Sequence, residues 1–205
     1  MLGAIDYFCP IKSSSLQPKR VVITGGPGTG KTSVIQALES SGFHCFHEVI
    51  RDLTLRARLE ETPDIQRTNP LAFVSDPHDF NRRLLEGRMR HFGQASGMAR
   101  PVVFYDRGLP DVLGYMDYFG QKYGPDYTSA CRENRYDKVL LLPPWKAIYI
   151  SDNERLESFE EAAEIHHYLS ATYERYGYQP VPIPEDSVSG RVAHILEELK
   201  REGYL

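Results

Sequence analysis

The stretch of sequence that decides the fold spans residues 20–33 and reads Arg20-Val21-Val22-Ile23-Thr24-Gly25-Gly26-Pro27-Gly28-Thr29-Gly30-Lys31-Thr32-Ser33. Its first part is a short run of β-branched residues that ends in glycines, which is typical of a buried strand. Residues 25–32 match the pattern G-x-x-x-x-G-K-[ST]. Glycines let the backbone curl so that its N–H groups converge on phosphate oxygens, and the following helix adds its positive N-terminus. The stretch therefore predicts a strand, a phosphate-binding loop and a helix.

This loop predicts a binding site for a nucleoside triphosphate with Mg²⁺. The residues that we expect to contact the nucleotide are Gly25, Gly26, Pro27, Gly28, Thr29, Gly30, Lys31, Thr32 and Ser33. Lys31 can reach the β- and γ-phosphates, and the Thr32 hydroxyl can hold Mg²⁺. We expect ATP as the nucleotide, and the sequence leaves GTP open.

Composition and charge narrow the class of protein. The chain has 205 residues, with 24 Lys and Arg against 28 Asp and Glu, so its formal net charge is −4. A protein that coats nucleic acid should be basic, so we expect no nucleic-acid partner. No apolar run approaches the ~20 residues of a membrane span. The three cysteines are scattered and residues 1–10 lack a secretory signal pattern, which favours a cytoplasmic protein. The sequence carries no signal for oligomeric state.

The rest of the chain alternates between strand and helix patterns. Short apolar runs predict strands at residues 43–47, 102–105, 139–142 and 179–183. Helical periodicity marks segments 34–38, 80–92, 159–176 and 188–199. The alternation predicts an α/β fold, a three-layer P-loop NTPase sandwich with a five-stranded parallel sheet in the order 2-3-1-4-5. We expect a loose leader over residues 1–18, one domain over 19–205, and a helical insert within 51–100.

Two common classes of P-loop protein fit the sequence poorly. Motor ATPases usually end the strand that binds Mg²⁺ in two acids, whereas strand 102–105 is followed by Asp106 and Arg107. Signalling GTPases usually read guanine with N-K-x-D, and no Asn-Lys pair occurs in this chain. Asp111 and Gly114 spell D-x-x-G, but they lie past the strand end, where we expect a helix to start.

Asp106 and Arg107 suit a small-molecule kinase instead. A carboxylate at the tip of the strand beside the phosphate loop can hold Mg²⁺. The neighbouring arginine can clamp an acceptor and stabilise charge on the transferred phosphoryl group. The pair resembles the D/E-R pair of nucleoside and nucleotide kinases, such as thymidylate kinase and the deoxynucleoside kinases. The alternative is an ion pair that merely ends a strand.

Glu48 ends the second predicted strand, so it should lie at the same sheet edge as the phosphate loop. The kinases named above carry an acid there, which contacts the acceptor hydroxyl and can act as a base. Arg51 lies one helical turn further on and could face the same pocket. The alternative is a helix-capping acid with a solvated arginine. We also assign Asp111 and Tyr115 to the acceptor side.

A lid and an aromatic cluster complete the candidate site. Residues 148–155 follow the fourth predicted strand, and Arg155 is the candidate contact for the γ-phosphate when the lid closes. An exposed charged loop is the alternative. The aromatic cluster could stack a substrate ring or belong to the core; its members are Tyr115, Tyr118, Phe119, Tyr123 and Tyr127.

The combination of motifs resembles one family. The segments that carry the resemblance are residues 23–32, Glu48-x-x-Arg51, residues 106–111 (D-R-G-L-P-D), residues 141–145 (L-L-P-P-W) and Asn153-Glu154-Arg155. They resemble a family of AAA-type predicted ATPases that is similar to the ribosylnicotinamide kinase domain of bacterial NAD-biosynthesis regulators. The resemblance covers about residues 20–200 and implies ATP and Mg²⁺ binding in a kinase-like fold, without naming a substrate. A similar eukaryotic branch is associated with GTP and lipid binding.

Two functional hypotheses follow from these observations. The first is a Mg²⁺-dependent kinase that phosphorylates a small metabolite such as a nucleoside, a nucleotide or a ribosyl compound. Its catalytic residues would be Lys31, Asp106, Arg107, Glu48 and Arg155. The second is a nucleotide-operated NTPase module that controls a protein or lipid partner.

Overall fold

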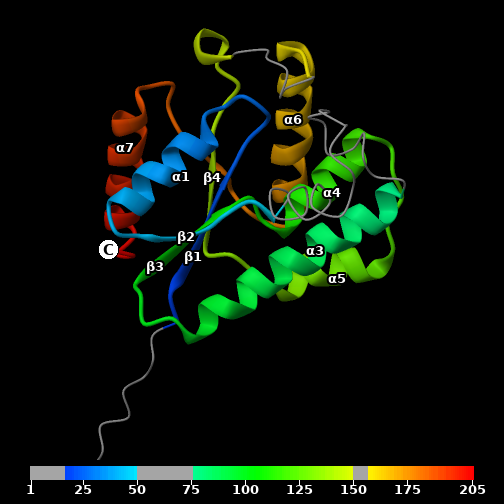
Figure 1. Cartoon of the computed structure of the whole chain (residues 1–205), viewed down its shortest axis with the longest axis horizontal. Helices are drawn as coiled ribbons and strands as arrows, with labels where there is room; N and C mark the ends of the chain where they lie inside the picture. The colour runs from blue at the N-terminus through cyan, green and yellow to red at the C-terminus, as the bar shows by residue number, and fades with distance from the viewer. Residues whose placement is uncertain (1–16, 50–75, 150–156) are drawn as a thin grey trace, which may run out of the picture.

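A five-stranded parallel sheet forms the centre of the molecule (Figure 1). The computed structural model describes residues 17–49, 76–149 and 157–205. The strands are β1 (Lys19–Thr24), β2 (His44–Phe46), β3 (Val102–Asp106), β4 (Lys138–Leu141) and β5 (Val181–Pro182). Each strand pairs in parallel with its neighbour, in the order β2-β3-β1-β4-β5. The predicted fold class and strand order are therefore confirmed.

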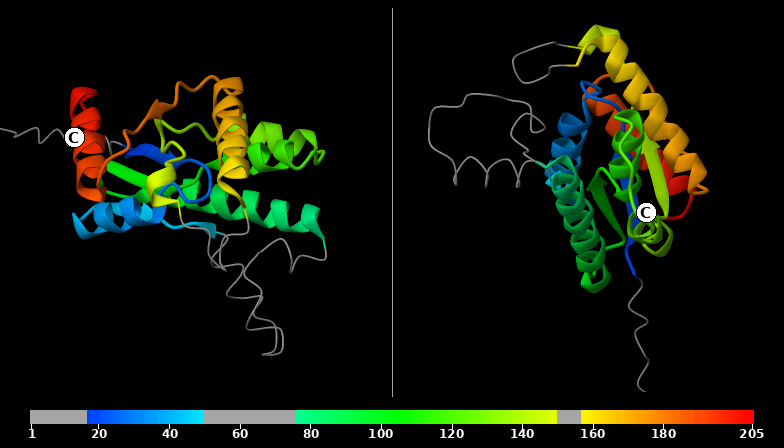
Figure 2. Two further views of the ribbon diagram at one scale, coloured as in Figure 1. Left: turned by 90° about the horizontal axis from the view of Figure 1, so that it is seen from above. Right: turned by 90° about the vertical axis from the view of Figure 1, so that its right-hand side faces the viewer.

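Helices cover both faces of this sheet. They are α1 (Lys31–Ser40), α3 (Pro77–Gln94), α4 (Leu109–Tyr118), α5 (Pro125–Glu133), α6 (Phe159–Arg175) and α7 (Val188–Arg201), with short 3₁₀ turns at Ala95–Gly97 and Lys146–Ile148. Figure 2 shows α1 and α7 together on one side of the molecule, with α4, α5 and α6 on the other. None of the helices in the described segments is long and apolar enough to cross a bilayer.

The strand sequences explain the three layers. Successive side chains of a strand point to opposite faces of a sheet. Val21 and Ile23 of β1 belong to the core cluster formed with α1 and α7, whereas Val22 belongs to the cluster formed with α3, α4, α5 and α6. In β3, Phe104 lies in the first cluster and Tyr105 in the second. The part of a strand that is buried on both faces is expected to be apolar without alternation, as Val21–Ile23 of β1 are.

Helical periodicity marks neither α4 nor α5, although a helix was expected to start at Asp111, within α4. Seven of the ten residues of α4 are buried, so its sequence shows no polar face to set the period. In α5, Pro125 supplies the helix start, since proline fits the first helical turn. The last strand, expected over residues 179–183, is shorter and spans Val181–Pro182, although the Ile183 N–H still donates to the Leu141 carbonyl at 3.0 Å.

Of the predicted insert within residues 51–100, the described part is α3 and the 3₁₀ turn after it. Asp76 caps α3, because its carboxylate accepts from the N–H groups of His78 and Asp79. The leader, apart from residues 17 and 18, and residues 50–75 and 150–156 lie outside the described residues.

Candidate active site

The phosphate loop depends on glycine at defined positions. Gly28 and Gly30 have φ of 72° and 83°, in the left-handed region that disfavours a Cβ. At Gly26 the limit is space, since a Cβ there would lie 2.5 Å from the Ala162 carbonyl oxygen of α6. A Cβ on Gly28 would lie 2.5 Å from the Tyr149 ring, so the segment after β4 passes over the loop. The loop is therefore enclosed by α6 and by the start of the predicted lid.

Lys31, the first residue of α1, turns back onto this loop. Its Nζ donates to the carbonyl oxygens of Gly25 at 2.8 Å and Gly26 at 2.7 Å, and lies 3.3 Å from Oγ1 of Thr29. Burial and the nearby Arg107 lower the pKa of Lys31 to about 7, while carboxylates around it oppose the change. The amine thus lies among loop carbonyls where phosphate oxygens are expected, with a proton that it can gain or lose near neutral pH.

Arg107 joins the end of β3 to its surroundings. Its Nε donates to Oε1 of Glu48 at 2.6 Å, and its Nη1 contacts Oδ1 of Asp111 at 3.2 Å and the Gly25 carbonyl at 3.3 Å. Its Nη2 donates to the Tyr115 hydroxyl at 3.1 Å. The side chain is only 7% exposed. The structure therefore brings four of the sequence-predicted residues into one network against the phosphate loop.

The backbone of Arg107 is strained. Among the described residues it is the one non-glycine residue with positive φ, at 72°. A left-handed backbone costs an L-residue about 1–2 kcal/mol, and such strain persists where the surroundings over-determine it. The four hydrogen bonds of the guanidinium hold the residue in this strained conformation. With this backbone conformation the side chain points back toward β2 and the phosphate loop.

Asp111 lies in the first turn of α4 and is fully buried. Its Oδ1 accepts from the Thr24 hydroxyl and from Arg107, and its Oδ2 accepts from the Gly108 N–H at 2.8 Å and the Tyr173 hydroxyl at 2.5 Å. Burial raises the pKa of this carboxyl, but Arg107 and the other donors outweigh burial and hold it below its ordinary value. Because its oxygens are engaged by the chain itself, the carboxylate links β1, β3, α4 and α6.

Glu48 follows β2 and is accessible from the site. Its side chain is 16% exposed. Burial raises its pKa, but the cations Arg107, Lys31 and Arg88 together outweigh burial and lower it. The carboxylate is therefore ionised at neutral pH and retains surface that an acceptor could contact. In Tyr115, burial raises the pKa of the phenol to about 12, so that hydroxyl stays neutral.

Asp106 ends β3 and is 4% exposed. The sheet register pairs it with Ile23 of β1, directly before the phosphate loop. Thr32 lies one residue into α1. A carboxylate and a hydroxyl are the oxygen donors that Mg²⁺ uses, commonly with one or two protein ligands. The donor types at this point of the fold therefore fit Mg²⁺.

Arg88 is a buried residue beside the site that the sequence analysis did not identify. Arg88 of α3 is 4% exposed, and its Nη1 donates to the Gly108 carbonyl at 2.9 Å, holding the turn after Arg107. The sequence pattern could have indicated Arg88, because it follows Leu84 and Leu85 at helical spacing and so lies on the apolar face of its helix. A cation on an apolar face requires a buried acceptor.

The remaining predicted residues either lie elsewhere in the described structure or fall outside it. Arg51 and Arg155 lie outside the described residues, and Ser33 is exposed on α1. Of the aromatic cluster, Tyr115 contacts Arg107, whereas the Tyr123 hydroxyl bonds Asp117 and Phe119 is 45% exposed.

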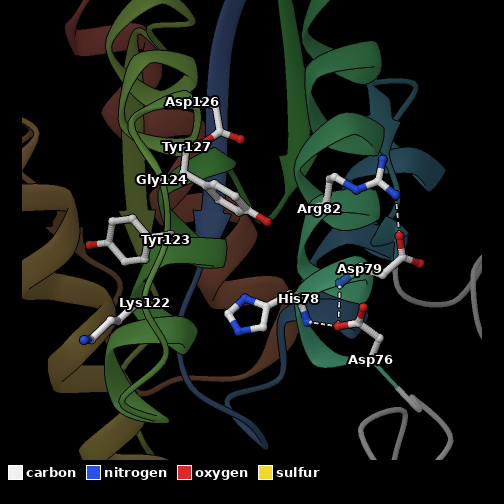
Figure 3. A pocket seen from close by; sticks show the side chains of 9 residues that line it. All are labelled: Asp76, His78, Asp79, Arg82, Lys122, Tyr123, Gly124, Asp126 and Tyr127. Atoms are coloured by element: carbon white, nitrogen blue, oxygen red, sulfur yellow. Dashed lines mark hydrogen bonds and ion pairs between the residues drawn. The ribbon is translucent and has the colours of Figure 1, made fainter.

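A separate cleft of about 470 Å³ lies between the starts of α3 and α5 (Figure 3). Its lining is charged and mostly exposed: Asp76, His78, Asp79, Arg82, Lys122, Tyr123, Gly124, Asp126 and Tyr127.

The loop between β1 and α1, the sheet order and the Asp-Arg pair at the end of β3 define a P-loop NTPase with a kinase-like fold. A sequence comparison specifies the family, since the model of the AAA domain family matches residues 20–191. The chain belongs to this family. No curated protein matches the chain in sequence.

Solved structures of kinases share the fold. The NadR protein in complex with NR superposes with a TM-score of 0.69 at 20% identity, covering 91% of this chain and 52% of NadR. The chain therefore spans about half the length of NadR. Deoxyadenosine kinase from M. mycoides, with a TM-score of 0.61 and 16% identity, covers 89% of this chain and is itself 99% covered. Thymidylate kinase from Candida albicans gives 0.66 at 12% identity, with 92% and 93% covered. The predicted resemblance is confirmed at the level of the fold.

Proposed function

We propose that the protein transfers the γ-phosphoryl group of ATP to a hydroxyl or phosphate group of a small metabolite. The observation that carries this proposal is the ion pair between Glu48 and Arg107, whose guanidinium also contacts the Gly25 carbonyl of the phosphate loop. An ionised carboxylate with exposed surface, within one side chain of a phosphate loop, is suited to accept a proton from an attacking hydroxyl.

In the proposed reaction, the acceptor oxygen attacks the γ-phosphorus of the bound nucleoside triphosphate. The acceptor oxygen forms a bond to the γ-phosphorus while the bond from that phosphorus to the bridging β-γ oxygen breaks, releasing the nucleoside diphosphate. Glu48 takes the hydroxyl proton, and Arg107 holds Glu48 in place. Most of the N–H groups of Arg107 are used within the chain, so its role in this proposal is to orient Glu48 and contribute positive charge.

The nucleotide side uses the loop N–H groups and Lys31. On binding, Lys31 would exchange the Gly25 and Gly26 carbonyls for phosphate oxygens, and the anion would raise the pKa of its amine. Thr32 and Asp106 would hold Mg²⁺, which neutralises phosphate charge and fixes its geometry when bound. Asp111 acts as a positioning residue behind Arg107.

The fold relatives support a small acceptor. The structures that this chain resembles are those of a protein bound to NR, of a deoxyadenosine kinase with products and of a thymidylate kinase. A nucleoside, a nucleotide or a ribosyl compound is therefore the first class of acceptor to examine. Their low identity to this chain leaves the choice among these acceptors to experiment.

Incubation with γ-labelled ATP or GTP, Mg²⁺ and a panel of nucleosides, nucleotides and ribosyl compounds tests the proposal. Transfer of label to one acceptor, lost in Glu48→Gln, supports it. A matched control is Glu86→Gln, which changes an exposed acid of α3 paired with Arg82 and should leave transfer unchanged. Slow hydrolysis without transfer to any acceptor would instead favour a nucleotide-operated module that controls a protein or lipid partner.

A further inference from the structure

Arg191, far along the chain from the phosphate loop, contacts it directly. The residue lies in the first turn of α7, and its Nη1 donates to the carbonyl oxygen of Thr29 at 2.7 Å across 162 positions of sequence. Its side chain is only 2% exposed. The approach is close, because a Cβ on Gly30 would lie 3.1 Å from Nη1. Arg191 is thus packed against the loop from the side of α7.

The charge of Arg191 is unusually poorly compensated. Its Nε and Nη2 are buried without a hydrogen-bond partner, and no carboxylate within the described segments forms an ion pair with it. Burial therefore lowers its pKa, with Glu185 and Asp186 opposing the change. An arginine remains charged even so. A buried guanidinium without an anionic partner is destabilising, so its presence calls for an explanation.

The other face of the guanidinium is covered by an aromatic ring. Its central carbon lies 4.8 Å from the centroid of the Trp145 ring, in cation–π contact. Trp145 belongs to the segment that leaves β4 and continues over the phosphate loop. It is the single tryptophan of the chain. Arg191 thus joins α7, the phosphate loop and this covering segment.

The geometry of the peptide bond gives the contact with Thr29 a consequence. A trans peptide is planar, and its C=O and N–H point in opposite directions. No cis peptide occurs in the described part of the chain. Anchoring the Thr29 carbonyl toward α7 therefore fixes the N–H of Gly30 in the opposite direction. A loop that binds phosphate needs its N–H groups inward and its carbonyls outward.

We propose that Arg191 is a positioning residue of the nucleotide site, which anchors the Thr29 carbonyl so that the Gly30 N–H is presented to the phosphates. Its uncompensated charge adds positive potential beside the loop, and Trp145 keeps that charge away from water. This inference rests on the proposed function only in that the loop must bind a nucleoside triphosphate. It does not require phosphoryl transfer.

The test measures nucleotide affinity in Arg191 variants. A fluorescent ATP analogue with Mg²⁺ is titrated into wild type, Arg191→Met and Arg191→Lys, and displaced with ATP and GTP. A charge-assisted buried hydrogen bond predicts at least about tenfold weaker binding in Arg191→Met. Arg191→Lys, which keeps one charged donor, should recover most of the affinity. Arg201→Met, which removes an exposed arginine of the same helix, is the matched control and should bind like wild type.

The outcomes separate this inference from the proposed function. If the wild type binds no nucleoside triphosphate, the proposed function fails. If the wild type binds and a folded Arg191→Met binds equally well, the inference is overturned and Arg191 is structural. If Arg191→Met does not fold, Arg191→Gln decides, with at least about threefold weaker binding expected and unchanged affinity overturning the inference. The KM for an acceptor, where one is found, should not change in any folded variant.

Discussion

Replacing Asp111 with asparagine separates a positioning role from a substrate contact. The carboxylate accepts hydrogen bonds from Thr24, Arg107, Gly108 and Tyr173 within a fully buried setting. Asparagine keeps the shape but loses the charge, and its amide would face either Arg107 or the Gly108 N–H. Removing one charged partner from a buried ion-pair network costs about 3–5 kcal/mol, a large share of the ~5–15 kcal/mol that holds a domain folded. Arg107 keeps its ion pair with Glu48, so the cost comes from the lost charge and from the buried donor that the asparagine amide would oppose.

Denaturant unfolding at pH 7 measures the lost free energy of unfolding, and thermal unfolding measures the corresponding fall in Tm. For a domain of this length, each kcal/mol lowers Tm by about 2–4 °C, so Asp111→Asn should melt roughly 6–20 °C below wild type. The pKa of Asp111 is lowered in the folded state, so its stabilisation is full above its ordinary value of 3.8 and is lost as pH falls through the folded value. The stability difference between variant and wild type should therefore narrow in acid.

The matched control lies on the same helix. Asp117 forms a partly exposed ion pair with Arg175 at 2.7 Å, so Asp117→Asn should cost less than about 1 kcal/mol. If Asp111→Asn is as stable as Asp117→Asn and loses only acceptor affinity, the positioning role is wrong. Asp111 is then a substrate contact, as the sequence alone suggested.

The remaining predictions concern the nucleotide and acceptor residues. Lys31→Ala should lower turnover by ~100-fold or more with a modest loss of nucleotide affinity. In wild type the nucleotide affinity should weaken as pH rises from about 6 to 8, because an amine with a pKa of about 7 loses its proton. The nucleotide affinity of Lys31→Ala should not change over the same pH range. Asp106→Asn should fold normally and lose activity at low Mg²⁺, with partial recovery at high Mg²⁺ that Lys31→Ala does not show; normal activity at low Mg²⁺ would count against a metal role. Glu48→Gln should lower kcat by about 100-fold or more and leave the nucleotide Kd unchanged, as stopped-flow and equilibrium binding would measure; a matching loss in Kd would point to a nucleotide contact instead.

The central sheet could be predicted from the sequence because burial on both faces leaves a direct signature. Val21, Val22 and Ile23 are apolar without alternation, and the glycine loop that follows orients the strand. The position of Glu48 near Asp106 and Arg107 follows from parallel strands that end at one edge. Among the described residues Arg107 is the ion-pair partner of Glu48, whereas Arg51, which the sequence placed one helical turn from Glu48, lies outside them.

The rest could not be predicted, because it depends on backbone geometry and long-range packing. Nothing in the residues around Arg107 indicates a left-handed conformation, which arises from the network that holds its side chain. The contact of Arg191 with Thr29 joins segments with no local pattern in common. For helix α4 the sequence indicated only a helix start near Asp111, because the helix is buried on most sides and therefore lacks the polar face that marks a surface helix.

The two ends of the sheet bear on how the molecule behaves when concentrated. β2 has three residues and β5 has two, one of them Pro182, which cannot donate to a neighbouring strand. Long, unprotected edge strands are the templates on which chains of different molecules pair and aggregate. Both edges here are short, and Pro182 offers no backbone N–H to a would-be partner strand. The protein should therefore tolerate the high concentrations that calorimetry and crystallisation demand.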